Sequence, residues 1–128
     1  PFLRISLFLG AMLMSLYPLP TAAAAIKAHY TSSQGNSIIL KLDVGNPPPN
    51  TIILIQKVPP GAEIAGSTPP YRSYKKKNGE IKWLIKKPAV GTLNIQLHLK
   101  NPVQEGSVSA MVRYLDANNG TFKTELVK

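Results

Sequence analysis

The chain has 128 residues, of which 44% are apolar, and its fifteen Lys and Arg against six Asp and Glu give a formal net charge of +9. This length predicts one domain, with enough apolar residues for a compact core. The absence of cysteine excludes disulfides, thiolate metal sites and cysteine catalysis. The positive charge favours polyanions, anionic surfaces or an acidic subunit as partners.

The first 25 residues are arranged like a secretory signal peptide. Arg4 precedes the mostly apolar run Ile5–Leu16, and the small-residue tract Ala22–Ala25 follows a proline-containing break. The apolar run is shorter than the roughly 20 residues of a membrane-spanning helix. We therefore predict a signal helix in residues 1–25, cleaved after the third or fourth alanine of the tract, and a mature domain of residues 26–128. An uncleaved N-terminal anchor is the alternative. Export predicts a cell-surface or extracellular location, with the periplasm as transit compartment.

Short strands are predicted next, at Ile26–Thr31 and Ser37–Val44, with a turn at Ser32–Asn36 between them. A proline-rich loop then leads to the strand Thr51–Val58, which is apolar on both faces. Either this is a central strand covered on both sides, or one face meets a partner protein. The predicted protein-protein interface residues are Ile53 and Ile55.

The middle of the chain predicts an edge strand at Ala62–Ala65 and a tight hairpin at Asn78-Gly79, because both residues of that pair tolerate positive φ. The strand after the hairpin places Ile81, Trp83 and Ile85 on one face. Trp83 is expected in the core, although a role as a ligand platform is the alternative.

The last third contains the most regular alternation, in Thr92–Leu99, and Asn101-Pro102 is expected to end that strand. A strand at Ser107–Leu115 follows, and a second hairpin turn at Asp116–Gly120 leads to an alternating C-terminal strand. The whole pattern predicts an all-β protein: an antiparallel β-sandwich of about seven to nine strands, with no helical period after the leader.

Several of these segments resemble a known family. Pro60-Gly61-Ala62 follows an apolar strand, Asn78–Trp83 and Pro88–Gly91 open further strands, and Gly106–Tyr114 closes the pattern. This arrangement resembles the DUF11-type immunoglobulin-like repeats of bacterial and archaeal surface proteins over roughly Ser37–Lys128. The resemblance implies an Ig-like sandwich. In size and layout the chain is also similar to the separately encoded globular subunit of a split type IV pilin, which pairs with a short helical pilin.

No catalytic constellation is visible in the sequence. The two histidines, His29 and His98, are isolated in predicted strands, and no G-x-S-x-G or comparable nucleophile turn occurs. The tract Asp116–Gly120 lacks the alternating acids and closing Glu of a calcium loop. We therefore expect a protein that is not an enzyme and uses no cofactor or metal: a secreted structural subunit of a pilus-like filament that works through protein-protein contacts.

A basic, tyrosine-containing segment surrounds the first predicted hairpin. Cations with interleaved aromatic rings are typical of nucleic-acid binding, but export argues against that partner. Acidic polysaccharide, anionic lipid or an acidic subunit fits a secreted protein better, and a solvated sheet edge that prevents aggregation is the structural alternative. The predicted contact residues are Tyr71, Arg72, Tyr74, Lys75, Lys76, Lys77, Lys82, Lys86 and Lys87.

Overall fold

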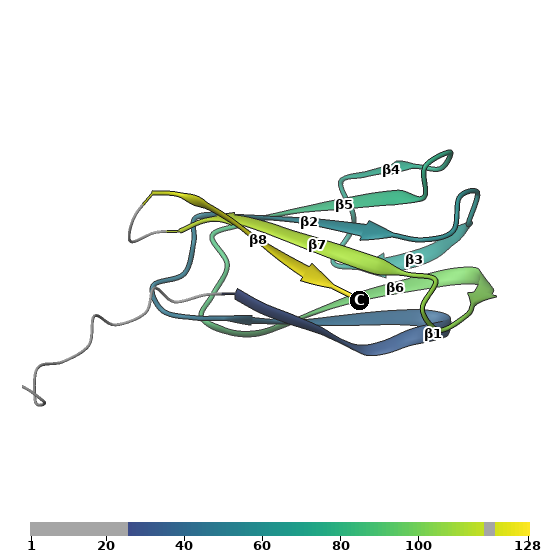
Figure 1. Ribbon diagram of the computed structural model, residues 1–128, viewed down its shortest axis with the longest axis horizontal. Coiled ribbons are helices and arrows are strands. Elements are labelled where there is room, and N and C mark those ends of the chain that lie inside the picture. Colours follow the sequence, from purple (N-terminus) through teal and green to yellow (C-terminus); the bar gives the residue numbers. More distant parts are fainter. Residues whose placement is uncertain (1–25, 117–119) are drawn as a thin grey trace, which may run out of the picture.

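The computed structural model describes residues 26–116 and 120–128, which form two antiparallel sheets packed face to face (Figure 1). One sheet has the order β1-β6-β3, with β1 at Ile26–Val44, β3 at Ile64–Thr68 and β6 at Gly91–Val103. The other has the order β4-β5-β2-β7-β8, with β2 at Thr51–Lys57, β4 at Ser73–Lys75, β5 at Glu80–Lys86, β7 at Ser109–Leu115 and β8 at Phe122–Val127. The prediction of an all-β sandwich is confirmed. The predicted signal helix lies outside the described residues, and none of the described ones belongs to a helix that could cross a membrane.

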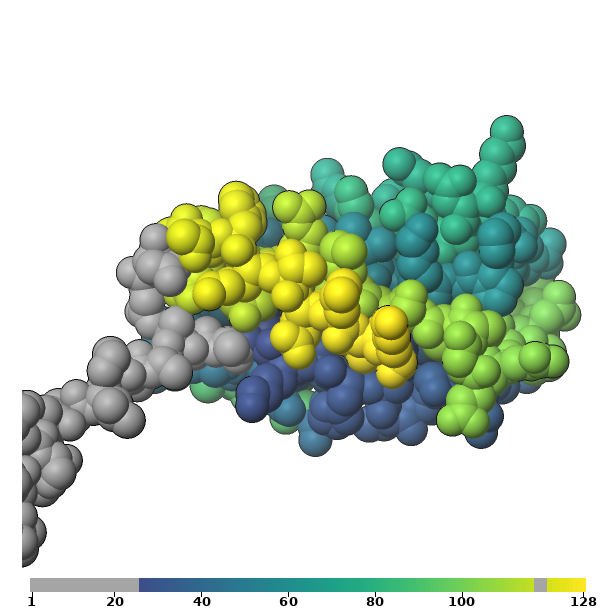
Figure 2. Space-filling view, in the orientation of Figure 1, coloured from purple at the N-terminus to yellow at the C-terminus, as the bar shows by residue number. Residues whose placement is uncertain are grey.

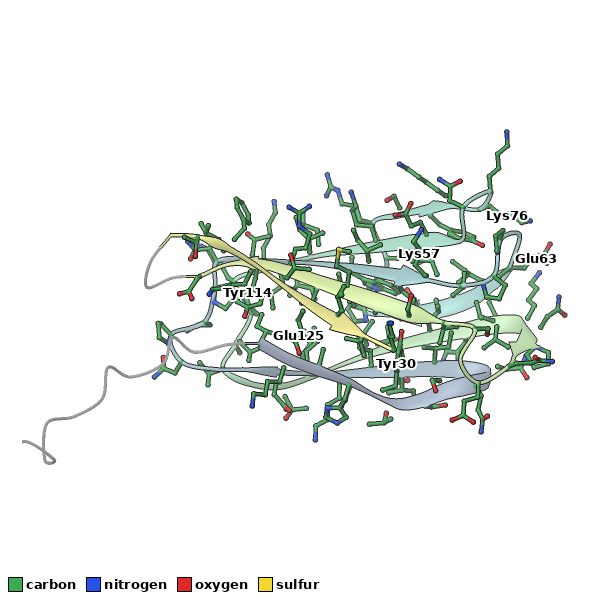
Figure 3. The ribbon with its side chains drawn as sticks, in the orientation of Figure 1. Tyr30, Lys57, Glu63, Lys76, Tyr114 and Glu125 are labelled. Atoms are coloured by element: carbon green, nitrogen blue, oxygen red, sulfur yellow. The ribbon has the colours of Figure 1, made fainter. Side chains whose placement is uncertain are left out.

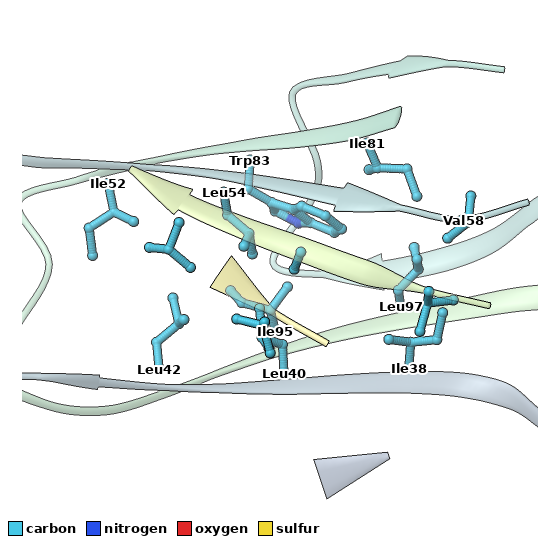
Figure 4. Close-up of a cluster of buried hydrophobic side chains, with 14 of the residues drawn as sticks. Ile38, Leu40, Leu42, Ile52, Leu54, Val58, Ile81, Trp83, Ile95 and Leu97 are labelled. Atoms are coloured by element: carbon cyan, nitrogen blue, oxygen red, sulfur yellow. The ribbon is translucent and has the colours of Figure 1, made fainter. Parts of the chain in front are cut away.

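The core lies between the two sheets and is built mainly by the alternation of buried and outward residues along β1, β2, β5, β6 and β7. Trp83 of β5 is 1% exposed, which confirms its predicted place in the core, and its indole N–H donates to the carbonyl of Pro69 at 2.8 Å. Each fully buried Ile or Leu contributes about 1.5–3 kcal/mol relative to an exposed one. Figure 4 shows the cluster that results, to which both sheets and the residue after β2 contribute: Ile38, Leu40, Leu42, Ile52, Leu54, Val58, Ile81, Trp83, Ile95 and Leu97.

β1 reverses its direction near Gly35, so its two arms lie side by side (Figure 1). The Ser32 hydroxyl donates to the carbonyl of Ser37 at 2.7 Å, whereas residues five apart in an extended strand are separated by about 16 Å. Gly35 has a φ of +77°, which suits a sharp turn. The chain therefore turns within the predicted range Ser32–Asn36. The two strands predicted on either side are nevertheless one strand, β1, because Gly35 in the turn pairs with Val103 of β6.

β6 is longer than predicted, because Asn101-Pro102 does not end it. Its pairing with β1 shifts between Ser37↔His98 and Gly35↔Val103, so β6 bulges there. A bulge interrupts the ladder and leaves residues without a partner strand. Proline, which has no N–H to donate, is accommodated at such a place.

Two predictions about the middle of the chain are wrong in detail. The edge strand expected at Ala62–Ala65 runs instead at Ile64–Thr68 and joins β6 in the smaller sheet, because a turn at Pro59–Ala62 carries the chain across the sandwich. The β4–β5 connection has the four residues Lys76–Gly79, and of these only Gly79 has a positive φ, at +66°. Its carbonyl accepts the N–H of Val58 at 2.8 Å, which fixes the longer turn.

Candidate functional site

The outer face of the five-stranded sheet carries a continuous group of apolar side chains. Strand register places Ile53 opposite Leu84, and Ile55 opposite Met111, which in turn lies opposite Leu126. Alternation turns all five away from the core, towards the outer side of the sheet. We call this group the outer patch, which consists of Ile53, Ile55, Leu84, Met111 and Leu126. A separate outward pair, Leu115 and Phe122, lies further along β7 and β8, beyond the polar pair Arg113 and Thr124.

The patch is most open at β8. Leu126 is 65% exposed, whereas Ile53 and Ile55 are half-buried by their neighbours. In the separate pair, Phe122 is 68% and Leu115 is 37% exposed. Figure 2 shows β8, coloured yellow, at the molecular surface beside the first arm of β1. Exposed apolar side chains are ordinary when scattered, but a contiguous group of them marks an interaction site.

Cations border the outer patch. Lys82 lies opposite Ile55, and Arg113 lies opposite Ile53. Among the described residues, Glu80 is the acidic residue of this face. The ammonium group of Lys57 lies 3.8 Å from its carboxylate. The face therefore has a surplus of positive charge around its apolar centre. Its basic residues are Lys57, Lys75, Lys82, Lys86, Arg113 and Lys128.

The outer face of the three-stranded sheet is different, because its outward positions are mostly polar and bond to one another. The Thr92 hydroxyl donates to Asp43 at 3.1 Å, and the Ser37 hydroxyl lies 3.0 Å from Nδ1 of His98. Where β1 and β6 pair, Ile39 is the one outward apolar residue among the described positions. An apolar outer face is therefore a property of the five-stranded sheet and not of both sheets.

A hollow of about 200 Å³ opens on the outer face where β2, β7 and β8 approach their ends. Its floor is mainly apolar, and a smaller hollow of about 70 Å³ adjoins it across Ile55 and Glu80. The larger hollow is lined by Ile55, Lys57, Glu80, Ser109, Ala110, Met111, Leu126, Val127 and Lys128.

The structure divides the predicted basic segment into separate groups. Lys76 and Lys77 occupy the tip of the β4–β5 hairpin, while Lys75 and Lys82 lie on the outer face. Lys86 is the last residue of β5 and Lys87 follows it, about 20 Å from the hairpin by strand rise. Arg72 is exposed just before β4, where its backbone N–H donates to the carbonyl of Lys82 at 2.7 Å.

The two tyrosines of that segment have unequal roles. Tyr74 donates its hydroxyl to the carbonyl of Ala62, and its pKa is raised, mainly by desolvation and further by Tyr71 and Glu63. It therefore joins β4 to the chain before β3. Tyr71 is 39% exposed and lies edge-on to Trp83 with 6.5 Å between ring centroids. Lys76 pairs with Glu63 at 3.5 Å (Figure 3), so its charge is partly compensated.

A buried polar bridge joins the two sheets and was not predicted from the sequence. The Tyr30 hydroxyl donates to Oε1 of Gln56 at 3.0 Å, and the Gln56 amide donates to the carbonyls of Lys57 and Ser109 at 2.8 and 3.0 Å. Burial raises the pKa of Tyr30 to about 12, and the bond to Gln56 acts in the opposite direction. Figure 3 shows Tyr30 between the sheets.

The histidines lie apart from this bridge. His29 and His98 are both exposed on the outer side of the smaller sheet. Within residues 26–116 and 120–128, no group of three or more His, Cys, Asp or Glu comes together that could hold a metal ion.

Comparison of the chain with models of known protein families, with curated proteins and with solved structures finds no match.

Sequence reasoning identified Ile53 and Ile55 but missed the rest of the outer patch. Alternation along Ser107–Leu115 puts Met111 and Leu115 on the face opposite Val112, and this was the available signal in the sequence. The sequence does not give the register of β7 against β2 and β8, which brings Met111 beside Ile55 and Leu126.

Proposed function

We propose that the protein is an exported, non-enzymatic structural subunit of a cell-surface or extracellular, pilus-like filament. Its immunoglobulin-like sandwich binds other subunits through the outer face of the five-stranded sheet. The observation that carries this proposal is the outer patch: a contiguous apolar group centred on Ile53 and Ile55, on one face of a sandwich whose opposite face is polar. Monomeric proteins rarely expose such groups unless they bind something.

The proposed partners are protein subunits of the surface assembly, including a short helical pilin. A sheet face with half-buried aliphatic side chains can bury apolar residues of a partner's helix or sheet. The apolar group provides the contact area, and the surrounding cations select a partner of opposite charge.

Purification from the native source without crosslinking tests this proposal. The protein is expected in a large assembly together with a second small protein, which mass spectrometry would identify. Recovery as a lone monomer, measured by light scattering on the native material, would contradict a structural role.

A second candidate function is a polyanion-binding module that acts through the basic hairpin. It is supported by the exposure of Lys75, Lys76 and Lys77, which project from the tip and edge of the β4–β5 hairpin. Acidic polysaccharide and anionic lipid surfaces are the ligands that such a tip would bind.

Salt distinguishes the two functions. Binding to a polyanion falls steeply as salt rises from about 0.05 to about 0.2 M, whereas an apolar interface survives this change. Replacing Lys76 and Lys77, which lie in the hairpin turn and not on the outer face, with Ser should weaken retention on a heparin column and leave assembly intact. Assembly that is lost in this double variant, with the outer patch unchanged, would favour the second function.

A further inference from the structure

We infer that the larger hollow on the outer face receives one large apolar side chain from an acidic segment of the partner protein. The carboxylates beside that side chain would be held by Lys57 and Lys128 at the rim. This inference rests on the proposed function and names the chemistry of the partner that the outer patch binds.

The size and lining of the hollow indicate a side chain as its occupant. Its volume of about 200 Å³ is below the roughly 300–1,000 Å³ of small-molecule pockets. Ile55, Met111 and Leu126 meet there by strand register, so the floor is apolar and its backbone groups are already used in the sheet. An apolar anchor from a partner, such as Phe or Leu, would bury this floor without leaving a polar group unpaired.

The charges at the rim indicate carboxylates beside that anchor. Lys57 is 3.8 Å from Glu80 and is therefore partly neutralised, whereas Lys128 makes none of the ion pairs found among the described residues. Lys75 and Lys82 line the adjoining hollow and add to the positive surplus. Carboxylates are consequently the groups that complement this rim.

The same charges argue against two other occupants. A second copy of this chain, docked through the same face, would bring like charges together, which costs binding energy. An anionic bilayer is a broad surface, whereas Ile55 and Met111 are half-buried at the floor of a depression that a projecting side chain can enter. The geometry therefore favours an acidic protein segment.

The ε-methyl group of Met111 provides a direct probe, because it lines the hollow and the chain has only three methionines. The experiment titrates methyl-labelled protein with the peptide Ac-Glu-Glu-Phe-Glu-Glu-NH2 and follows this resonance by NMR. The signal is assigned by its loss in Met111→Leu. A saturable shift is expected. The peptide with Ser in place of Phe, and the peptide with Lys in place of Glu, should leave Met111 unmoved.

Charge variants test the rim. Replacing both Lys57 and Lys128 with Gln should weaken peptide binding about three- to tenfold, as expected for two partly exposed ion pairs. The matched control replaces Lys27 and Lys41, which lie on the other sheet, with Gln. The control removes the same total charge and should change binding less than twofold.

Several outcomes would overturn the inference. These are no saturable Met111 shift up to about 5 mM peptide, equal binding of the Ser peptide, or equal weakening by the control variant. A Met111 shift caused by phosphatidylglycerol vesicles and not by the peptide would assign the hollow to lipid. A dimer at low salt, broken by Leu126→Glu, would assign it to a second copy.

The proposed function can fail separately. If native assemblies form normally from a Leu126→Glu variant, the inference about the hollow fails and the structural role stands. If the peptide binds as expected but the native protein is a lone monomer, the hollow is a binding site and the structural role fails.

Discussion

At Gly79 the backbone leaves no room for a side chain. A Cβ atom there would lie 2.0 Å from the carbonyl oxygen of Val58, and φ is +66°. Gly35 has a similar φ of +77°, but a Cβ atom added to it would meet nothing within 4 Å. The two glycines therefore separate the effect of a close contact from the effect of backbone conformation.

We predict that Gly79→Ala lowers the free energy of unfolding by about 2–4 kcal/mol, from the left-handed backbone and the steric clash together. Gly35→Ala should cost only about 1 kcal/mol, because the backbone term acts alone. Urea denaturation of both variants measures the difference. Equal losses would show that the contact with Val58 relaxes at little cost.

Because the pKa of the Tyr30 phenol is raised in the folded protein, we predict that the protein loses stability at alkaline pH. This pKa is about 12 in the folded protein against an ordinary value of 10.0, so the folded state retains a proton that the unfolded state releases. Its contribution is complete below pH about 10 and is lost as pH rises towards about 12. In urea denaturation between these limits, wild type should lose more stability than Tyr30→Phe. Parallel curves would contradict this prediction, since lysine titration affects both proteins alike.

Strand β2 has one face in the core and one face on the surface, so its two sets of aliphatic residues have different roles. Changing Ile53 and Ile55 together to Thr keeps β-branched side chains that suit a strand. We predict that this variant folds with a thermal midpoint within a few degrees of wild type but no longer assembles with its partner.

Ile39 provides a matched control, because it is also half-buried and points outward, but from the other sheet. Ile39→Thr should leave assembly unchanged. Pull-down of the native partner by each variant, together with a thermal melt, tests the pair. If the double variant still assembles, the outward residues of β2 are not part of the interface.

The strands were predictable where alternation alone determines them. β6 and β7 follow it closely: Ile95, Leu97 and Leu99 point inward, and so do Val112 and Tyr114. The extension of β6 past Pro102 was not predictable, because a proline is acceptable there only as part of a bulge against β1. Bulges depend on the partner strand, which a single strand's sequence does not specify.

The candidate site was predictable only in part, for a related reason. Ile53 and Ile55 stand out because their strand is apolar on both faces. Leu84 and Leu126 join them through register, a property of the assembled sheet. Nearness in sequence was misleading for Lys86 and Lys87, since an extended strand separates them from the hairpin tip.

The whole chain has a net charge of +9, and in the part that the structure describes the apolar outer patch faces away from the core. At about 0.05 M salt, repulsion between copies should keep the protein monomeric. At about 1 M salt, where the Debye length is roughly 3 Å, we predict weak self-association through the outer patch. Sedimentation velocity at both salt concentrations measures this, and Ile55→Thr should suppress the association. A dimer at low salt would contradict this account of the surface.

The way the first strand enters the sandwich constrains how the proposed leader can be removed. Ile26 is 1% exposed, and its backbone N–H donates to the Tyr114 hydroxyl at 3.3 Å. Cleavage directly before Ile26 would convert this buried amide into an α-amino group, whose charged form is disfavoured by burial. Cleavage one residue earlier would keep the amide and leave the new terminus at Ala25. The fold therefore favours the earlier of the two predicted cleavage positions. The packing of the first strand would then determine which cleavage product folds without a buried charge at its new N-terminus.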